Sequence, residues 1–541
     1  HDLLNQLDGN TPCVALSADT RADAQAIHSS LVQETPQYGI PAASLTTEAM
    51  PVAAAVAMAS TPASGAQTGV AANTSRKRVY MAMAIDRSGS MSGTAGQNTG
   101  GQNKLQAAIN DAGSMIFLMQ NNDKLGVINF DDQITVDFPS GGSNVQTLKV
   151  NNATDDRDTA TSSLFTLTPR NYTDIAGALT RAKGMLTGLD NEGVPAIVLL
   201  TDGHQEGVTL RDGTTNIMNN MNFTGFPAVY AICLGPVADQ TILSQIAQAT
   251  KGAFHYAATQ DVLQQIYNEI ASGTTIGATL ANDVKKLRPF LVLKSEASVS
   301  TLQSQILFLV NWQDPNLTFV PGQVPGMGQI AVQINGPTGY RLDNAKLVTV
   351  GKGYAVYLVS DATPGTYSAQ AKLMSGQHNS AVLTIGIFDP ANVIRLLSMP
   401  SRQAVVTGQQ PMEILSAATT SSGHIFNKTN VQVTLHRPLA APPQINQMPM
   451  SAMAMAAQPV YQTGVPDAGG APIDHMGMLA SIPMGEETIA STTHPLRGGD
   501  LTHISEMPTV PGPHVAFIRT TAYDDVGFPT TLVKRVSFWA Y

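Results

Sequence analysis

The chain has 541 residues, of which 43% are hydrophobic and 13% are charged, and its formal net charge is −9. This length is too great for a single hydrophobic core, and domain sizes in general predict three or four units. The negative balance, with no basic cluster beyond Arg76-Lys77-Arg78, argues against nucleic acids and anionic membranes as partners. No run approaches the about 20 apolar residues of a membrane span, so no transmembrane segment is expected.

The low charge content favours a protein that works outside the cell. Charged residues reach only half of the roughly 25% that is usual in globular proteins, while small and uncharged polar residues are abundant. The composition therefore predicts a secreted or cell-surface protein. Two cysteines, Cys13 and Cys233, provide no disulfide framework. Cys233 lies in an apolar run, where a cysteine often serves as a small hydrophobe, and a bridge between the two remains open.

The first 75 residues contain little that predicts a core. Residues 1–42 mix short polar and apolar pieces, with one amphipathic helical pattern over residues 20–33. Residues 43–75 are rich in Ala, Ser, Thr and Gly and have little periodicity. We interpret residues 1–42 as an N-terminal segment and residues 43–75 as a linker or extended arm.

Strand and helix patterns alternate from residue 76 to residue 273. Such alternation predicts a largely parallel sheet with helices on both faces. Asp131 and Asp132 separate two short strand patterns, which predicts a hairpin and an antiparallel edge. Residues 139–170 form a long polar insertion, which we expect close to the ligand face. The predicted strands are 79–85, 124–130, 134–138, 196–200, 227–234 and 253–257, and the predicted helices are 104–120, 174–189, 212–221, 240–249 and 260–271.

Three oxygen-bearing side chains follow the first of these strands on alternate residues. Asp86, Ser88 and Ser90 come directly after the buried run VYMAMAI. In open α/β sheets ligands bind at the carboxyl ends of strands, and alternate side chains of an extended segment point the same way. Carboxylate and hydroxyl oxygens are hard donors that suit Mg²⁺, Mn²⁺ or Ca²⁺. The pattern therefore predicts that the three side chains reach one ion.

Three separated pieces together resemble the metal-ion-dependent adhesion site of von Willebrand factor A domains. The first is the D-x-S-x-S sequence of Asp86, Ser88 and Ser90; the second is Thr173, which begins the helical pattern TDIAGAL; the third is Asp202, which ends AIVLLTDG. The resemblance covers residues 76–273 and implies a doubly wound, Rossmann-like α/β fold.

The same resemblance implies a role for each of these residues. Ser88 and Ser90 would coordinate a divalent cation directly, and Thr173 would bind it directly or through water. Asp86 and Asp202 would accept hydrogen bonds from the coordinating hydroxyls and waters. Mg²⁺ is the cofactor expected first, with Ca²⁺ or Mn²⁺ as further candidates. A simpler interpretation also remains, in which Ser and Thr cap helices and the Asp residues end strands.

The function implied is non-catalytic protein binding or adhesion. With few carboxylates on the ion, it would accept an Asp or Glu carboxylate of a protein partner as its last ligand. No H-E-x-x-H, G-x-S-x-G or Walker A motif occurs, so we expect no enzyme. A structural subunit of a surface layer or extracellular filament, with self-association, is the alternative. His204 and Glu206 are expected at the edge of the site.

The remainder of the chain predicts two β-sandwiches of immunoglobulin-like type. Residues 274–385 show short alternating strands with Gly/Pro turns, and residues 386–541 show a second set. The NW strand and later G-P-T-G and P-G-T-Y turns resemble the β domain that follows the A domain in calcium-activated chloride channel regulator proteins and their bacterial relatives, which implies that Trp312 is a core residue. Residues 438–512, rich in Pro, Met, Ala and Gly, are interpreted as an insertion. Its methionines indicate packing at an interface or, as the alternative, Cu(I) binding.

Overall fold

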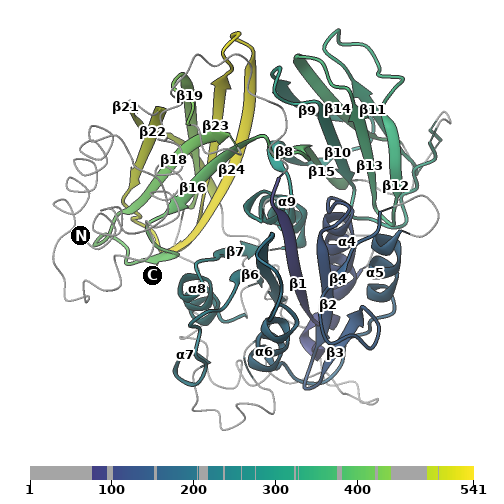
Figure 1. Cartoon of the computed structure of the whole chain (residues 1–541), viewed down its shortest axis with the longest axis vertical. Coiled ribbons are helices and arrows are strands. Elements are labelled where there is room, and N and C mark those ends of the chain that lie inside the picture. Colours follow the sequence, from purple (N-terminus) through teal and green to yellow (C-terminus); the bar gives the residue numbers. More distant parts are fainter. Residues whose placement is uncertain are drawn as a thin grey trace, which may run out of the picture.

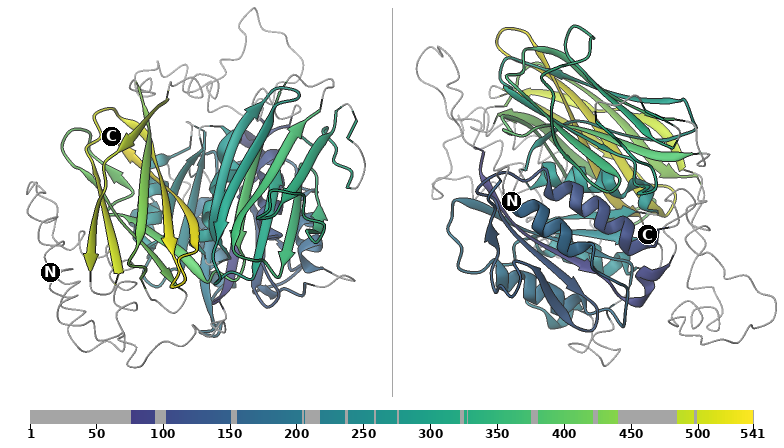
Figure 2. Two further views of the ribbon diagram at one scale, coloured as in Figure 1. Left: turned by 90° about the horizontal axis from the view of Figure 1, so that it is seen from above. Right: turned by 90° about the vertical axis from the view of Figure 1, so that its right-hand side faces the viewer.

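The computed structural model describes residues 76–540, except for 94–101, 151–154, 204, 206–216, 236–237, 258, 275, 322–324, 327, 375–379, 421–424, 440–483 and 497–498. Predictions for the N-terminal segment and the arm, for Cys13, His204 and Glu206, and for the methionine-rich stretch therefore lie outside the described residues. An α/β part carries two groups of β-sheets on one side (Figures 1 and 2). Among the described helices, none combines the length and the apolar character needed to cross a membrane.

The α/β part contains a seven-stranded sheet, as the alternation of patterns predicted. Its strand order is β3-β2-β1-β5-β6-β7, with β4 paired to β2. The pairs that β1 makes with β2 and β5 are parallel, and so are β5–β6 and β6–β7. The pair β2–β3 is antiparallel, which confirms the predicted hairpin at the edge. The strands are β1 Arg78–Asp86, β2 Lys124–Phe130, β3 Ile134–Phe138, β4 Gln146–Thr147, β5 Gly193–Thr201, β6 Ala228–Leu234 and β7 Ala253–Ala257.

Strand β1 lies at the centre of the sheet and is buried on both faces. Met81 and Met83 belong to one buried cluster, which includes side chains of α4, α5 and α9. Tyr80 and Ala82 belong to the opposite cluster, with side chains of α6, α7 and α8. Because both faces are covered, the strand is continuously apolar instead of alternating. The helices are α4 Lys104–Ile116, α5 Asp156–Leu164, α6 Ile175–Met185, α7 Ile217–Asn220, α8 Gln240–Ala249 and α9 Leu263–Gly273, with short 3-10 turns η2 Gly89–Ser92 and η4 Gln260–Val262.

Most of the polar insertion, residues 139–170, does not lie beside the ligand face, where it was predicted. It contains β4 and the helix α5, which packs against α4. Arg157 near the start of α5 donates to the backbone oxygens of Phe117 and Met119, at the end of α4 away from the motif. Among the hydrogen bonds of its described residues, the one that reaches the motif comes from the last residue, Arg170, whose N–H donates to the oxygen of Arg87 at 2.7 Å. The predicted position is therefore wrong for most of the insertion.

The part after residue 275 consists of sheets, which confirms its predicted all-β character. One group pairs a five-stranded sheet, β12-β13-β10-β15-β8, with a three-stranded sheet, β11-β14-β9. The strands are β8 Ala278–Leu287, β9 Val292–Val299, β10 Gln305–Asn311, β11 Ile330–Asn335, β12 Lys346–Val350, β13 Tyr354–Ser360, β14 Gly365–Leu373 and β15 Ala381–Asp389.

The second group pairs a four-stranded sheet, β16-β18-β22-β21, with a five-stranded sheet, β17-β24-β23-β19-β20. Three of its strands, β20 to β22, fall inside the insertion predicted over residues 438–512, so that part of the insertion is built into the sheets. The strands are β16 Ile394–Pro400, β17 Ala404–Val405, β18 Met412–Thr420, β19 Thr429–Pro438, β20 Met484–Ile489, β21 Thr492–Leu496, β22 Gly499–Glu506, β23 Gly512–Tyr523 and β24 Pro529–Ala540.

Strand β10 joins the sheets to the α/β part. Ile306 and Phe308 face the core between the sheets, whereas Leu307 and Leu309 belong to the cluster around α4 and α9. Trp312, predicted as a core residue, is 1% exposed, and its Nε1 donates to the oxygen of Leu317 at 3.0 Å.

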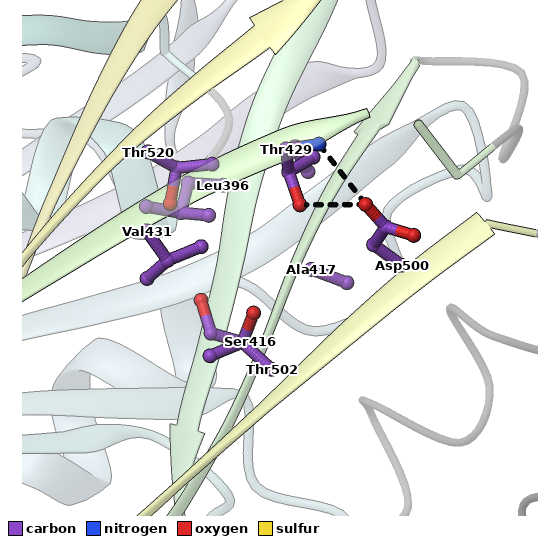
Figure 3. Close-up of a pocket in the computed structure, with 9 residues that line it drawn as sticks. Leu396, Ser416, Ala417, Thr429, Val431, Asp500, Thr502 and Thr520 are labelled. Atoms are coloured by element: carbon purple, nitrogen blue, oxygen red, sulfur yellow. Dashed lines mark hydrogen bonds between the residues drawn. The ribbon is translucent and has the colours of Figure 1, made fainter. Parts of the chain in front are cut away.

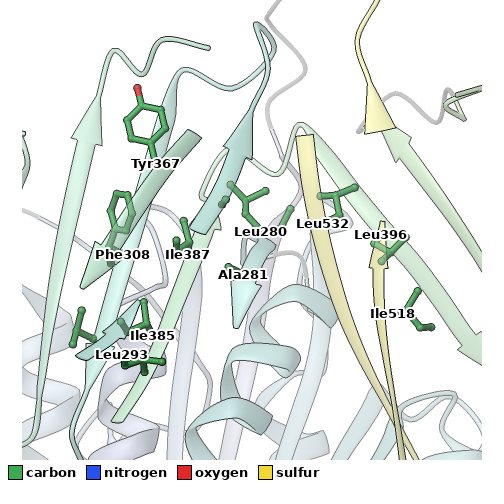
Figure 4. Close-up of a cluster of buried hydrophobic side chains, with 14 of the residues drawn as sticks. Leu280, Ala281, Leu293, Phe308, Tyr367, Ile385, Ile387, Leu396, Ile518 and Leu532 are labelled. Atoms are coloured by element: carbon green, nitrogen blue, oxygen red, sulfur yellow. The ribbon is translucent and has the colours of Figure 1, made fainter. Parts of the chain in front are cut away.

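The two groups of sheets share one continuous hydrophobic core (Figure 4). Leu280 and Ala281 on β8 lie between the first group, represented by Ile387, and the second, represented by Leu532 and Leu396. At the end of β24, the ring of Trp539 meets that of Tyr256 on β7, with centroids 5.2 Å apart. The three parts of the described chain are therefore packed against one another, which holds the α/β sheet in a fixed setting.

Candidate functional site

The carboxyl ends of β1 and β5 lie side by side and bring two predicted elements together. In the parallel pairing Ile85 is opposite Leu200, so Asp86 and Thr201 follow next to each other. The Thr201 hydroxyl donates to Asp86 Oδ2 at 2.5 Å, and the Ser88 backbone N–H donates to Asp86 Oδ1 at 2.7 Å. Both oxygens of this fully buried carboxylate therefore accept hydrogen bonds.

The two serines of the motif connect to Asp202. Ser88 Oγ lies 3.0 Å from Ser90 Oγ, and Ser90 Oγ donates to Asp202 Oδ1 at 2.6 Å. Ser88 and Asp202 are buried, whereas Ser90, which lies between them in this chain of contacts, is exposed. The first and third pieces of the predicted site thus meet at one edge of the sheet.

Thr173 lies beside the same loop but does not cap the helix that follows it. The N-cap of α6 is Asp174, whose side chain accepts the Gly177 N–H at 3.0 Å. The interpretation of Thr173 as a simple helix cap is therefore wrong. A Cβ placed on Gly203 would lie 2.9 Å from Thr173 Oγ1, which shows that the hydroxyl packs directly against the residue after Asp202. We refer to Asp86, Ser88, Ser90, Thr173 and Asp202 as the rim site.

The structure adds a residue that sequence reasoning missed, Lys104. Its Nζ lies 2.5 Å from Asp202 Oδ2, and the lysine side chain is only 10% exposed. Lys104 is the first residue of α4, after the N-cap Asn103. A cation is unfavourable at the positive end of a helix dipole, so a nearby carboxylate favours a lysine at this position. That conflict is a signal in the sequence that could have singled out Lys104, although it does not identify Asp202 as the partner.

The charges at the rim site do not balance. Asp86 and Asp202 are two neighbouring buried carboxylates, and the ammonium group of Lys104 pairs with Asp202. Desolvation, followed by the nearby charge of Asp202, raises the pKa of Asp86 to about 7, while hydrogen bonds from Thr201 and Ser88 oppose the shift. A further positive charge near these carboxylates would therefore be favourable.

The donor atoms fit a hard divalent cation. All five side chains present oxygen, and three of them are uncharged hydroxyls. In the described part of the chain, no group of three or more His, Cys, Asp or Glu side chains is arranged to hold a metal. An ion at the rim site would therefore depend on the hydroxyls as much as on the carboxylates.

A third buried carboxylate, Asp131, supports the loops of the rim site. It lies just after β2, and its Oδ2 is 3.1 Å from Arg87 Nε and 2.6 Å from Arg170 Nε. Its backbone oxygen accepts the N–H of Asp174 at 2.8 Å. Asp131 therefore ties the motif loop to the segment that carries Thr173, whereas the sequence indicated only a turn residue here.

The hollow between strands of the second group of sheets does not supply a second site. The hollow drawn in Figure 3 is lined by residues of β16, β18, β19, β22 and β23 and has no room for a water molecule. Of its polar residues, Asp500 and Thr429 pair directly: Asp500 Oδ2 accepts from the N–H of Thr429 at 3.0 Å and from its hydroxyl at 3.1 Å.

Comparison with protein families supports the reading of the α/β part. Residues 81–205 match the von Willebrand factor type A domain family. Domains of this family are generally non-enzymatic interaction modules. The matched range includes all five residues of the rim site. A search of curated proteins finds no match to the chain.

Several solved structures are similar to parts of the chain. A von Willebrand factor type A protein from Catenulispora acidiphila is 14% identical with a TM-score of 0.32; the match covers 64% of this chain and 63%, less than two thirds, of that protein. Proximal thread matrix protein 1 of the mussel byssus is 15% identical, with coverages of 40% and 50% and a TM-score of 0.28. The von Willebrand domain of the type V pilus tip protein Mfa5 from Porphyromonas gingivalis is 14% identical, with coverages of 37% and 95% and a TM-score of 0.26.

Proposed function

We propose that this chain is an extracellular or cell-surface binding protein whose rim site holds a divalent cation, Mg²⁺ first, and captures a carboxylate of a protein partner. The observation that carries the proposal is the continuous set of contacts from Ser88 through Ser90 to Asp202, with Asp86 held beside it by Thr201. The family match over residues 81–205 supports an interaction role.

The residues of the rim site would divide the work of holding the ion. Ser88, Ser90 and Thr173 offer hydroxyl oxygens, while the carboxylates of Asp86 and Asp202 hold hydroxyl groups in place and supply negative charge. The ion, when bound, supplies a Lewis-acidic position for one more oxygen ligand. An Asp or Glu side chain of a partner suits that position because it is anionic and a hard donor.

The exposure of Ser90 gives the partner a route to the site. Ser90 is exposed, while Asp86, Ser88 and Asp202 are buried behind it. A partner side chain would therefore approach from the side of Ser90, along the edge of the sheet. This arrangement favours recognition of a protruding carboxylate over recognition of a flat surface.

Isothermal titration of the full chain with Mg²⁺ and with Mn²⁺ tests the metal site. We expect one binding site per chain, lost in Asp86→Ala. The matched control is Asp190→Ala, which removes an exposed aspartate that pairs with Lys124 instead of with the rim site. Equal metal binding by wild type and Asp86→Ala would contradict the proposal.

Carboxylate capture has its own test. With Mn²⁺ bound to the wild-type chain, acetate should displace coordinated water and lower the relaxation enhancement of the water protons. Asp86→Ala should show no such response. A bound Mn²⁺ whose water relaxation does not respond to acetate would retain the metal but contradict carboxylate capture.

Size-exclusion chromatography with and without EDTA separates adhesion from the structural alternative. The proposed binding protein should elute as the same small species in both buffers. Large assemblies that are indifferent to EDTA would instead support a subunit of a surface layer or filament.

A further inference from the structure

We propose that Lys104 is a built-in competitor of the divalent cation: its ammonium group holds Asp202 when no metal is bound and has to leave it when metal binds. This inference rests on the proposed function of the rim site. It assigns to the chain a device that weakens metal binding and links metal occupancy to the start of α4.

The first argument is that Lys104 and the rim site share one carboxylate. Asp202 Oδ1 accepts the Ser90 hydroxyl at 2.6 Å, and its Oδ2 lies 2.5 Å from Lys104 Nζ. The ammonium group of Lys104 therefore contacts the same carboxylate, Asp202, that connects the motif serines to the end of β5. A metal ion bound at Ser90 would be attracted by the charge of Asp202. It would also be repelled by the ammonium group of Lys104, which contacts the same carboxylate.

The second argument is the charge balance. Asp86 and Asp202 carry two negative charges when ionised, so a divalent cation alone neutralises them. With Lys104 still in place the site would carry one excess positive charge within a buried environment, where such charges interact strongly. The ammonium and the divalent cation are therefore alternatives at this carboxylate.

The third argument is that Lys104 is placed where it can move. Its side chain runs past Gly93, where even an added Cβ would lie 3.4 Å from Lys104 Cε, an ordinary van der Waals contact, so the backbone at this position does not clamp the stem. Its backbone N–H donates to the Gly93 oxygen at 2.9 Å, which anchors the main chain while the long side chain retains its rotamers. The positive end of α4 does not favour an ammonium group, and in the described part of the chain the partner of Lys104 Nζ is Asp202.

Metal titration of a charge-removing variant tests the inference. We expect Lys104→Met to bind Mg²⁺ at least tenfold more tightly than wild type, and Lys104→Arg, which keeps the charge, to remain within threefold of wild type. The matched control is Lys124→Met, which removes a lysine that pairs with Asp190 at 2.8 Å away from the rim site. Its Mg²⁺ affinity should equal that of wild type.

The outcomes distinguish this inference from the proposed function. If wild type binds Mg²⁺ and Lys104→Met binds it equally or more weakly, the competitor is disproved while the metal site stands. If none of these proteins binds Mg²⁺ or Mn²⁺, the metal site and the competitor both fall.

A measurement on the wild-type chain does not depend on the folding of any variant. Acetylation of lysines with an amine-reactive reagent, followed by mass spectrometry, reports the reactivity of each ammonium group. We expect Lys104 to react slowly in EDTA and at least several-fold faster in saturating Mg²⁺, with Lys124 unchanged. Equal reactivity of Lys104 in both buffers, with metal binding verified in the same sample, would overturn the inference.

Discussion

Two buried carboxylates lie against the same helix, α4, yet their surroundings differ. Asp202 faces the ammonium of Lys104 at 2.5 Å and the hydroxyl of Ser90. Asp111, on α4 itself, is equally buried but faces the amide of Asn311, whose Nδ2 donates to Asp111 Oδ1 at 2.9 Å. Its other oxygen accepts no hydrogen bond in the described structure.

The surroundings of Asp202 stabilise a charged carboxylate, whereas those of Asp111 favour an uncharged one. Desolvation raises the pKa of Asp111 well above its ordinary value, so burial among amides favours the neutral acid. Asp111 joins α4 to β10, where Gln264 also accepts from Asn311 at 2.5 Å and from Ser114 at 2.7 Å. Burial of an acid therefore does not by itself indicate a functional site; at Asp202 a counter-charge and a neighbouring hydroxyl accompany the burial.

The largest expected effect is the pH dependence of stability that Asp111 imposes. Because its folded pKa is raised, the native state binds more protons than the unfolded state, and stability falls as the pH rises above about 4, the ordinary pKa. The slope reaches about 1.4 kcal/mol per pH unit for one group. Asp111→Asn removes this titration, so wild type should lose stability relative to the variant between pH 4 and pH 7.

Urea unfolding at a series of pH values measures that difference. The free energy of unfolding of wild type is compared with that of Asp111→Asn at each pH. A difference in favour of wild type that stays constant, or that grows with pH, would show that Asp111 is ionised in the folded protein. The comparison of the two carboxylates would then fail.

Asparagine substitution at both positions sharpens the comparison. Asp202→Asn should weaken Mg²⁺ binding at least 100-fold, about 2.7 kcal/mol, because it removes a charge of the rim site. Asp111→Asn changes the same chemical group about two turns further along α4 from Lys104 and should leave the Mg²⁺ affinity within twofold of wild type. Calorimetric titration of both variants is the measurement. A similar loss of Mg²⁺ affinity in both variants would mean that metal binding depends on any change near α4 and not on the charges of the rim site.

Metal should also stabilise the folded chain. At a free Mg²⁺ concentration 100 times the dissociation constant, binding to the native state adds about 2.7 kcal/mol to the free energy of unfolding. We therefore expect a higher unfolding midpoint for wild type in Mg²⁺ than in EDTA. Asp202→Asn should unfold at the same midpoint in both buffers. A shift of equal size in the variant would place the stabilising ion elsewhere.

A smaller effect is expected from Gly203→Ala. The new methyl group would lie 2.9 Å from Thr173 Oγ1, closer than normal contact, so the hydroxyl has to shift. We expect about tenfold weaker Mg²⁺ binding, or about 1.4 kcal/mol, with the fold retained. Gly184→Ala is the matched control: it lies within α6 with open space around its Cβ position and should stabilise the helix by about 0.5–1 kcal/mol. Unchanged binding by Gly203→Ala would remove Thr173 from the site.

The sequence predicted those parts of the structure that depend on local pattern. The apolar run ending at Asp86 predicted β1, and alternation along the chain predicted the sheet and its covered faces. The sequence also predicted that the motif of Asp86, Ser88 and Ser90 lies close to Asp202. Both follow buried strands, and parallel strands end at one edge of the sheet.

The parts that it missed depend on contacts between distant residues or on weak patterns. Lys104 meets a carboxylate 98 positions away, and nothing in its neighbourhood identifies that partner. Helix α5 reads DRDTATSSL and buries few apolar side chains, so its periodicity is faint. Strand β20 reads MGEETI and is largely exposed, and it is held by pairing with β19 instead of by its own hydrophobicity.

The central claim is that five oxygen-bearing side chains share one ion at the edge of the α/β sheet. Crystals of the chain grown with Mn²⁺, measured for anomalous scattering, test it most directly. We predict one anomalous peak within coordination distance of Ser88 Oγ and Ser90 Oγ, with Lys104 Nζ no longer on Asp202. Two results would contradict the account. One is Mn²⁺ at full occupancy elsewhere with none at this position; the other is an ordered rim site without metal in which Lys104 is still paired with Asp202.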